Sequence, residues 1–174
     1  MRIGLIGFGK MGKAIERIAI ERGHVITFRS HSENPLASID LSETDVAIEF
    51  TRPELAKNHI YQCFHADLPI VVGTTAWNQF IPEIKQAVAS LNGSLLYSSN
   101  FSIGVNIAFK VNEILAQLMS KHSGYEASIE EIHHTEKLDS PSGTAVSFAE
   151  GLIKYNGKYS SWISDQEKNS HTAS

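Results

Sequence analysis

The first hundred residues alternate between short apolar runs and longer amphipathic stretches. The apolar runs predict strands, and the stretches in which apolar residues recur every three or four positions predict helices. Strands are predicted at 2–6, 25–28, 45–50, 69–72 and 94–97, and helices at 11–22, 53–65 and 79–91. Strands that alternate with helices are typical of a Rossmann-like, doubly wound parallel sheet. We therefore expect an α/β fold that binds ligands beyond the carboxyl ends of its strands.

The pattern changes after Ser102. The predicted elements there are an amphipathic helix through about Met119, a strand at 126–133 and a helix at 142–152. We therefore expect a dinucleotide-binding domain at 1–102 and a second domain at 103–174. From Lys154 onward the residues are polar and poorly patterned.

Composition narrows the classes of function. The 174 residues, 42% hydrophobic and 20% charged, suit one globular domain or one domain and part of another. A formal net charge of -4 and the lack of a long basic run argue against nucleic acid as a partner. No run approaches the roughly 18 apolar residues that span a bilayer, and the N-terminus lacks the apolar core of a signal peptide. The single cysteine, Cys63, fits a reducing compartment. We expect a cytoplasmic protein with no membrane partner.

A glycine-rich motif follows the first predicted strand and opens a helix. It reads Gly7-Phe8-Gly9-Lys10-Met11-Gly12 and fits the pattern G-x-G-x-x-G. In such loops the first glycine permits the turn, the second lets backbone N–H groups approach a pyrophosphate, and the third lets helix and strand pack closely. This context indicates dinucleotide binding. The alternative is a glycine-rich turn without a ligand.

The end of the second predicted strand bears on the choice of cofactor. In dinucleotide-binding folds an acid at this point favours NAD, and an arginine favours the 2′-phosphate of NADP. The sequence offers Arg29 there, followed by Ser30, with no carboxylate before Glu33. We therefore expect Arg29 to bind the phosphate of NADPH. The alternative is a solvated arginine at a strand end.

Two further segments lie at the carboxyl ends of predicted strands. They are Gly73-Thr74-Thr75 and Ser98-Ser99-Asn100-Phe101. Small residues, hydroxyls and an amide suit the lining of a nicotinamide site. In isolation each segment would be an ordinary turn.

The segment EIHHTEKLDSPSGTA, from Glu131 to Ala145, carries candidate catalytic groups. His133 and His134 point to opposite sides of a strand, so one can face a cleft and donate a proton at neutral pH. Lys137 adds a cation or a second proton donor. A helix capped by Ser140, with Pro141 at its first position, would leave N–H groups near Gly143 and Thr144 to bind a carboxylate. The alternative is a surface histidine pair.

These segments resemble those of bacterial dihydrodipicolinate reductases. The family signature is E-x-H-H-x-x-K-x-D-x-P-S-G-T-A, and GFGKMG, VGTT and SSNFSIGVN also match family segments in the same order. The resemblance implies an enzyme of diaminopimelate and lysine biosynthesis. There NADPH or NADH delivers hydride to a small cyclic dicarboxylate, 4-hydroxy-tetrahydrodipicolinate, giving tetrahydrodipicolinate with loss of water.

The resemblance also implies residue roles. His133 would be the acid/base residue, Lys137 a second proton donor and His134 a substrate contact, with Gly143 and Thr144 holding a carboxylate. The pyrophosphate would lie at residues 7–11, and the nicotinamide at residues 73–75 and 98–101.

The chain departs from the family at two points. The acid, or Glu-Arg pair, that the family carries after the second strand is not evident. Family members also continue beyond Ser174, so the second, α+β substrate and oligomerisation domain is expected to be incomplete here, as is the sheet that forms the family's homotetramer. Two alternatives stay open: a related dehydrogenase of another amino-acid-derived acid, and a dinucleotide-binding fragment with impaired catalysis.

Overall fold

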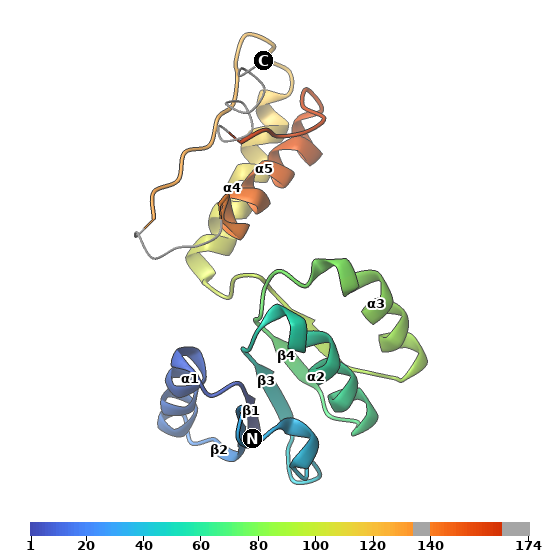
Figure 1. The fold of residues 1–174 in the computed structure, drawn as a ribbon. Helices are drawn as coiled ribbons and strands as arrows, with labels where there is room; N and C mark the ends of the chain where they lie inside the picture. The colour runs from blue at the N-terminus through green and yellow to red at the C-terminus, as the bar shows by residue number, and fades with distance from the viewer. Residues whose placement is uncertain (134–139, 165–174) are drawn as a thin grey trace, which may run out of the picture. The chain divides into compact units, whose positions relative to one another are not determined.

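The computed structural model describes residues 1–133 and 140–164. Within it the chain divides into two compact units, residues 1–99 and the residues from Asn100 onward. Each unit is described by itself below (Figure 1). No helix in the described part of the chain is long and apolar enough to cross a bilayer.

The first unit contains a five-stranded parallel sheet in the order β2-β1-β3-β4-β5. Its strands are β1 (Arg2–Ile6), β2 (Val25–Ser30), β3 (Val46–Glu49), β4 (Ile70–Val72) and β5 (Leu95–Tyr97). Its α-helices are α1 (Lys10–Glu21), α2 (Pro53–His65) and α3 (Ile81–Ser90), and the short helices η1 (Leu36–Ser38) and η2 (Asn78–Phe80) lie in loops. The predicted Rossmann-like fold is confirmed.

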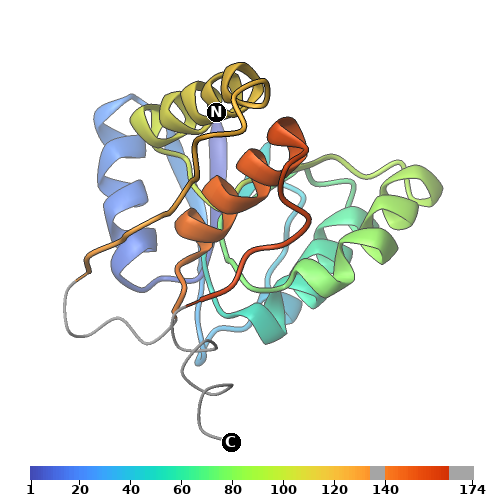
Figure 2. The same ribbon diagram turned by 90° about the horizontal axis from the view of Figure 1, so that it is seen from above.

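Helices cover both faces of this sheet, as Figures 1 and 2 show. On one face, Ile3 and Leu5 of β1 pack with Ala19 of α1. On the other face, Ile6 of the same strand belongs to a larger core with residues of α2 and α3. Successive side chains of a strand point to opposite faces, which explains this division. Each fully buried Ile or Leu contributes roughly 1.5–3 kcal/mol of hydrophobic stabilisation.

The strand order creates a point at which neighbouring loops diverge. The chain moves from β1 outward to β2, returns to β3 on the other side of β1, and then continues to β4 and β5. The carboxyl ends of β1 and β3 therefore lie side by side, at the position where open α/β sheets bind ligands.

The second unit pairs α4 (Ile103–Met119) with α5 (Gly143–Asn156). The rings of Phe109 and Phe148 meet edge to face with centroids 4.9 Å apart. Asn112 donates from Nδ2 to the carbonyl of Phe148 at 2.9 Å, and Asn156 donates to the carbonyl of Ala116 at 3.2 Å. These side chains join the two helices along their length.

Two local predictions for this unit are wrong. Residues 126–133 form no strand, because no other segment among the described residues pairs with them. The helix cap is Ser142, which accepts from the N–H of Ala145, so neither Ser140 as cap nor Pro141 as first helical residue holds. The helix also continues to Asn156 and ends at Gly157, whose φ of 69° suits a C-terminal glycine.

Candidate functional site

The glycine loop joins β1 to α1 under tight steric limits. Gly7 has a φ of +94°, and a Cβ on it would lie 2.1 Å from the carbonyl oxygen of Phe50. A Cβ on Gly12 would lie 2.2 Å from the carbonyl oxygen of Gly7. A Cβ on Gly9, by contrast, would have no neighbour within 4 Å. Gly7 and Gly12 are thus required by the fold, whereas Gly9 leaves open space at the start of α1.

Three loops meet around a pocket of about 340 Å³ at the carboxyl edge of the sheet. The residues that line it are Gly9, Lys10, Met11, Phe50, Thr51, Pro53, Gly73, Thr74 and Thr75. The structure thus brings two predicted segments together, the glycine loop and the loop after β4. The start of α1 has no side-chain cap and no acidic residue in its first turn, which leaves its N–H groups suited to an anion.

Phe50, Thr51 and Pro53 line the same pocket and were not among the predicted site residues. They follow β3 directly. The signal for them lay in the topology, because in such a sheet the strand beside β1 ends next to the glycine loop.

Thr74 connects the walls of this pocket. Its buried hydroxyl accepts from the backbone N–H of Thr51 at 2.7 Å, and its carbonyl accepts from the indole N–H of Trp77 at 2.8 Å. The hydroxyl of Thr51 donates in turn to Oε1 of Glu49, a fully buried carboxylate at the end of β3. Two loops of the pocket are therefore fixed to each other and to the sheet.

Arg29 lies inside β2, which extends two residues further than predicted. Its guanidinium forms an ion pair with Glu16 of α1 and lies 5.6 Å from the ring centroid of Phe8. Its side chain is 43% exposed. The residue is therefore beside the glycine loop but already has a carboxylate partner.

The four residues from Ser98 to Phe101 follow β5 and span the boundary between the two units, and the two that belong to the first unit, Ser98 and Ser99, do not line the pocket. Ser98 donates its N–H to the carbonyl of Val72 at 3.3 Å. Asn100 accepts from the N–H of Ser102 at 2.8 Å and thereby leads into α4.

The second unit contains a histidine bound to a carboxylate. Nε2 of His133 lies 2.8 Å from Oε2 of Glu131. Glu131 also accepts from the backbone N–H of Ser142 at 2.8 Å and from the Ser142 hydroxyl. These hydrogen bonds, those from Ser142 first and that from His133 after them, lower the pKa of Glu131 to about 2. The carboxylate is therefore ionised at neutral pH.

Gly143 and Thr144 are the first two residues of α5. The first intrahelical bond runs from the N–H of Val146 to the carbonyl of Ser142 at 3.0 Å, and the N–H of Ala145 donates to the Ser142 hydroxyl. The N–H groups of 143 and 144 therefore lie ahead of the helical ladder. Predicted residues His134 and Lys137 lie outside the described residues. Among the described residues, no cluster of three or more His, Cys, Asp or Glu side chains is arranged to hold a metal ion.

Both units are similar to known proteins. Residues 1–101 match the family described as dihydrodipicolinate reductase, N-terminus, and residues 104–173 match dihydrodipicolinate reductase, C-terminus. A solved structure, dipicolinate-bound dihydrodipicolinate reductase from Paenisporosarcina sp. TG-14, resembles the fold with a TM-score of 0.68 at 21% identity. That similarity covers 95% of this chain and 70% of the other.

Two curated relatives carry the same name, 4-hydroxy-tetrahydrodipicolinate reductase. The protein from Christiangramia forsetii is 39% identical over 166 residues, which is 95% of this chain and 70% of the relative. The protein from Neisseria gonorrhoeae is 35% identical over 118 residues, which is 68% of this chain and 43% of the relative. The same family matches both halves of the sequence, and the relatives and the fold are consistent with it. The chain belongs to the dihydrodipicolinate reductase family.

Proposed function

We propose that this chain reduces 4-hydroxy-tetrahydrodipicolinate to tetrahydrodipicolinate with NADPH or NADH, in diaminopimelate and lysine biosynthesis. One observation carries the proposal. Glu131 binds both His133 and the start of α5, so a proton donor is tied to a helix N-terminus that can receive a carboxylate. A substrate that carries carboxylates and gains a proton suits this pair of groups.

The pocket in the first unit suits the dinucleotide. In our proposal Gly7 and Gly12 shape the loop, while the N–H groups at the start of α1, beside Gly9, hold the pyrophosphate. Residues 73–75 and 98–101 flank the nicotinamide. When bound, the cofactor supplies the hydride. The two domains would then be 1–102 for the dinucleotide and 103–174 for the substrate.

In this proposal His133, Lys137 and His134 act on the substrate. Hydride addition leaves negative charge on the substrate ring, and His133 supplies the proton that neutralises it. Lys137 serves as a second proton donor and His134 as a substrate contact. The N–H groups of Gly143 and Thr144 hold one substrate carboxylate, where the positive end of the α5 dipole favours an anion.

The choice between NADPH and NADH depends on Arg29 in this proposal. A 2′-phosphate beside β2 would compete with Glu16 for the guanidinium. Titration of NADPH and NADH against the protein and its Arg29→Ala variant tests this. We expect the variant to lose affinity for NADPH and keep that for NADH. An unchanged preference would remove Arg29 from the site.

The main test combines His133→Gln with Lys137→Ala. We expect turnover of the cyclic dicarboxylate to fall by at least about 100-fold, the contribution of one positioned general acid. Binding of NADPH, followed by its fluorescence, is expected to stay unchanged. Retained turnover would contradict the assignment. NADPH binding without any turnover by the unmodified chain would instead indicate a dinucleotide-binding protein that lacks catalysis.

We further propose a location in the cytoplasm. The family resemblance suggests a homotetramer, although the sheet that forms it is expected to be incomplete in this chain. Light scattering after size-exclusion chromatography measures the assembly, and a mass other than that of four chains would contradict it.

A further inference from the structure

The carboxylate of Glu131 accepts hydrogen bonds from two parts of the second unit. Oε1 accepts from the backbone N–H of Ser142 at 2.8 Å. Oε2 accepts from the Ser142 hydroxyl and from Nε2 of His133 at 2.8 Å. The Ser142 oxygen accepts in turn from the N–H of Ala145 at 3.0 Å, which caps α5. One side chain thus joins the imidazole to the start of the helix.

This arrangement fixes the protonation of the imidazole. Glu131 is an ionised carboxylate, so its oxygens only accept hydrogen bonds. Nε2 of His133 must therefore carry the proton that it shares with Oε2. In the neutral ring this leaves Nδ1 without a proton, as the nitrogen available to a substrate.

We propose that Glu131 is a positioning residue that holds His133 with its proton on Nε2 and ties this ring to the carboxylate-binding start of α5. The inference rests on the proposed reductase function. In the reaction, the imidazolium gives the proton on Nδ1 to the substrate and returns to the neutral form with Nε2 protonated. Because the same carboxylate holds Ser142, the proton donor and the carboxylate site keep a constant separation.

The Glu131→Gln and Ser142→Ala variants together separate the two halves of this role. In Glu131→Gln the side-chain oxygen can still accept from the N–H of Ser142. The amide NH₂ that replaces Oε2 can accept neither from the Ser142 hydroxyl nor from His133, so the ring loses its fixed orientation. Ser142→Ala also removes the hydroxyl but leaves the contact between Glu131 and His133 in place, so the difference between the two variants reports that contact.

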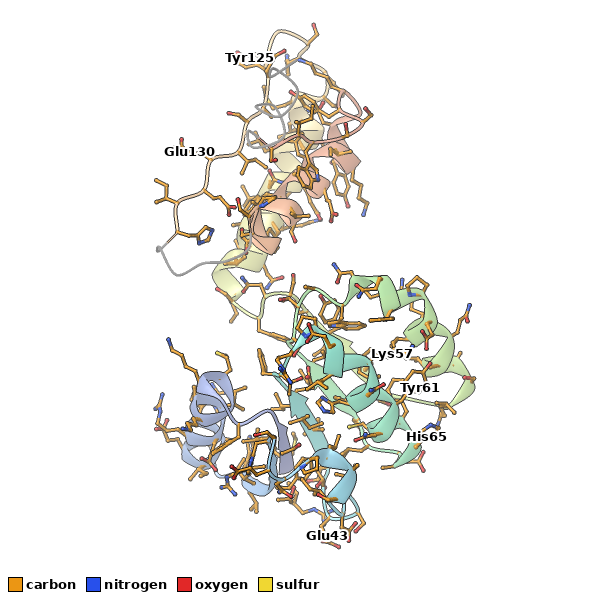
Figure 3. The ribbon with its side chains drawn as sticks, viewed as in Figure 1. Glu43, Lys57, Tyr61, His65, Tyr125 and Glu130 are labelled. Atoms are coloured by element: carbon orange, nitrogen blue, oxygen red, sulfur yellow. The ribbon has the colours of Figure 1, made fainter. Side chains whose placement is uncertain are left out.

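A matched control is Glu130→Gln, which removes the same charge from the neighbouring, exposed position on the same extended segment, labelled in Figure 3. We expect Glu131→Gln to lower kcat by about 100-fold, the size of a general-acid contribution. KM for the dicarboxylate should change far less, and NADPH affinity should not change. Ser142→Ala should mainly raise KM. Glu130→Gln should leave both kinetic parameters unchanged.

A second measurement does not depend on turnover. Nitrogen NMR of histidine-labelled protein distinguishes an Nε2–H ring from an Nδ1–H ring, and the His133 signal is identified by its loss in His133→Gln. We expect the unmodified protein to show His133 as Nε2–H at neutral pH, and Glu131→Gln to show a mixture of tautomers.

The outcomes separate the inference from the function on which it rests. An Nδ1–H ring in the unmodified protein, or an unchanged kcat in Glu131→Gln, would overturn the role of Glu131. Absence of dicarboxylate turnover in the unmodified protein would overturn the proposed function instead, while the NMR result would still decide whether Glu131 sets the tautomer.

Discussion

The backbone N–H of Thr51 donates to the hydroxyl of Thr74 at 2.7 Å, and this bond joins the loop after β3 to the loop after β4. Both residues line the pocket at the carboxyl edge of the sheet. The Thr74 hydroxyl is therefore part of the scaffold of this pocket as well as of its wall.

Replacement of Thr74 by valine keeps the shape of the side chain and removes the acceptor. A part-buried N–H left without its partner costs about 1–3 kcal/mol, so the midpoint of thermal unfolding should fall by several degrees. NADPH affinity should fall as well. Thr75→Val is the control, because Thr75 lines the pocket from an exposed position and should affect affinity alone. Equal thermal midpoints for the two variants would contradict this division.

The glycines of the first loop should respond differently to alanine. Gly12→Ala places a Cβ 2.2 Å from a backbone oxygen, so we expect a loss of stability of roughly 1–3 kcal/mol or more. Gly9→Ala meets nothing within 4 Å, so its unfolding should match that of the unmodified protein while its dinucleotide affinity falls at least tenfold. Chemical denaturation and NADPH titration measure the two effects. A stable Gly9→Ala variant with full affinity would contradict the position of the pyrophosphate.

Cys63 should be inert in the folded protein. It is fully buried in α2, and burial, with a smaller contribution from the charge of Glu49, raises the pKa of its thiol to about 12. At pH 8 the thiolate fraction is then on the order of 10⁻⁴. Because the chain has one cysteine, iodoacetamide labelling followed by mass spectrometry reports this residue alone. We expect labelling only at the rate of unfolding, and complete labelling in denaturant. Rapid labelling of the native protein would show that α2 does not bury the thiol.

Acid should weaken the start of α5 through Glu131. The pKa of this group is about 2 in the folded chain and 4.5 in its ordinary state, so ionised Glu131 stabilises the fold above about pH 4.5. That contribution is lost as the pH falls from about 4.5 towards 2. The difference in denaturation midpoint between the unmodified protein and Glu131→Gln should therefore be largest near neutral pH and shrink in acid. A difference that stays constant over this range would contradict the hydrogen-bonded carboxylate.

Local pattern predicted most of the first unit. The apolar runs and the glycine motif fixed the strands, and α2 begins and ends where its periodicity indicates, at Pro53 and His65. The same pattern did not predict that Phe50 and Thr51 line the pocket, because their position depends on which strand lies beside β1. Strand order is a tertiary property that hydrophobic periodicity does not contain.

Two predictions made from the local sequence of the second unit were wrong, each for a physical reason. Two serines flank Pro141, and either satisfies the pattern of a cap, so the sequence did not distinguish Ser142 from Ser140. The partial alternation of apolar and polar residues over 126–133 suits a strand, but a strand exists only where a neighbour supplies hydrogen bonds. The contact between Glu131 and His133 likewise follows from side chains two residues apart on an extended segment, a spacing that the motif contains but does not explain.

The pocket at the carboxyl edge takes its walls from the ends of β1, β3 and β4, from Gly9 to Thr75 along the chain. None of these segments makes the site without the others, so a binding-competent pocket appears late in folding, after the long-range pairings of the parallel sheet have formed. A dinucleotide that binds only this assembled state stabilises it by mass action, and the gain grows with the logarithm of ligand concentration. Cofactor supply would then raise the equilibrium stability of the first unit, in addition to supporting turnover.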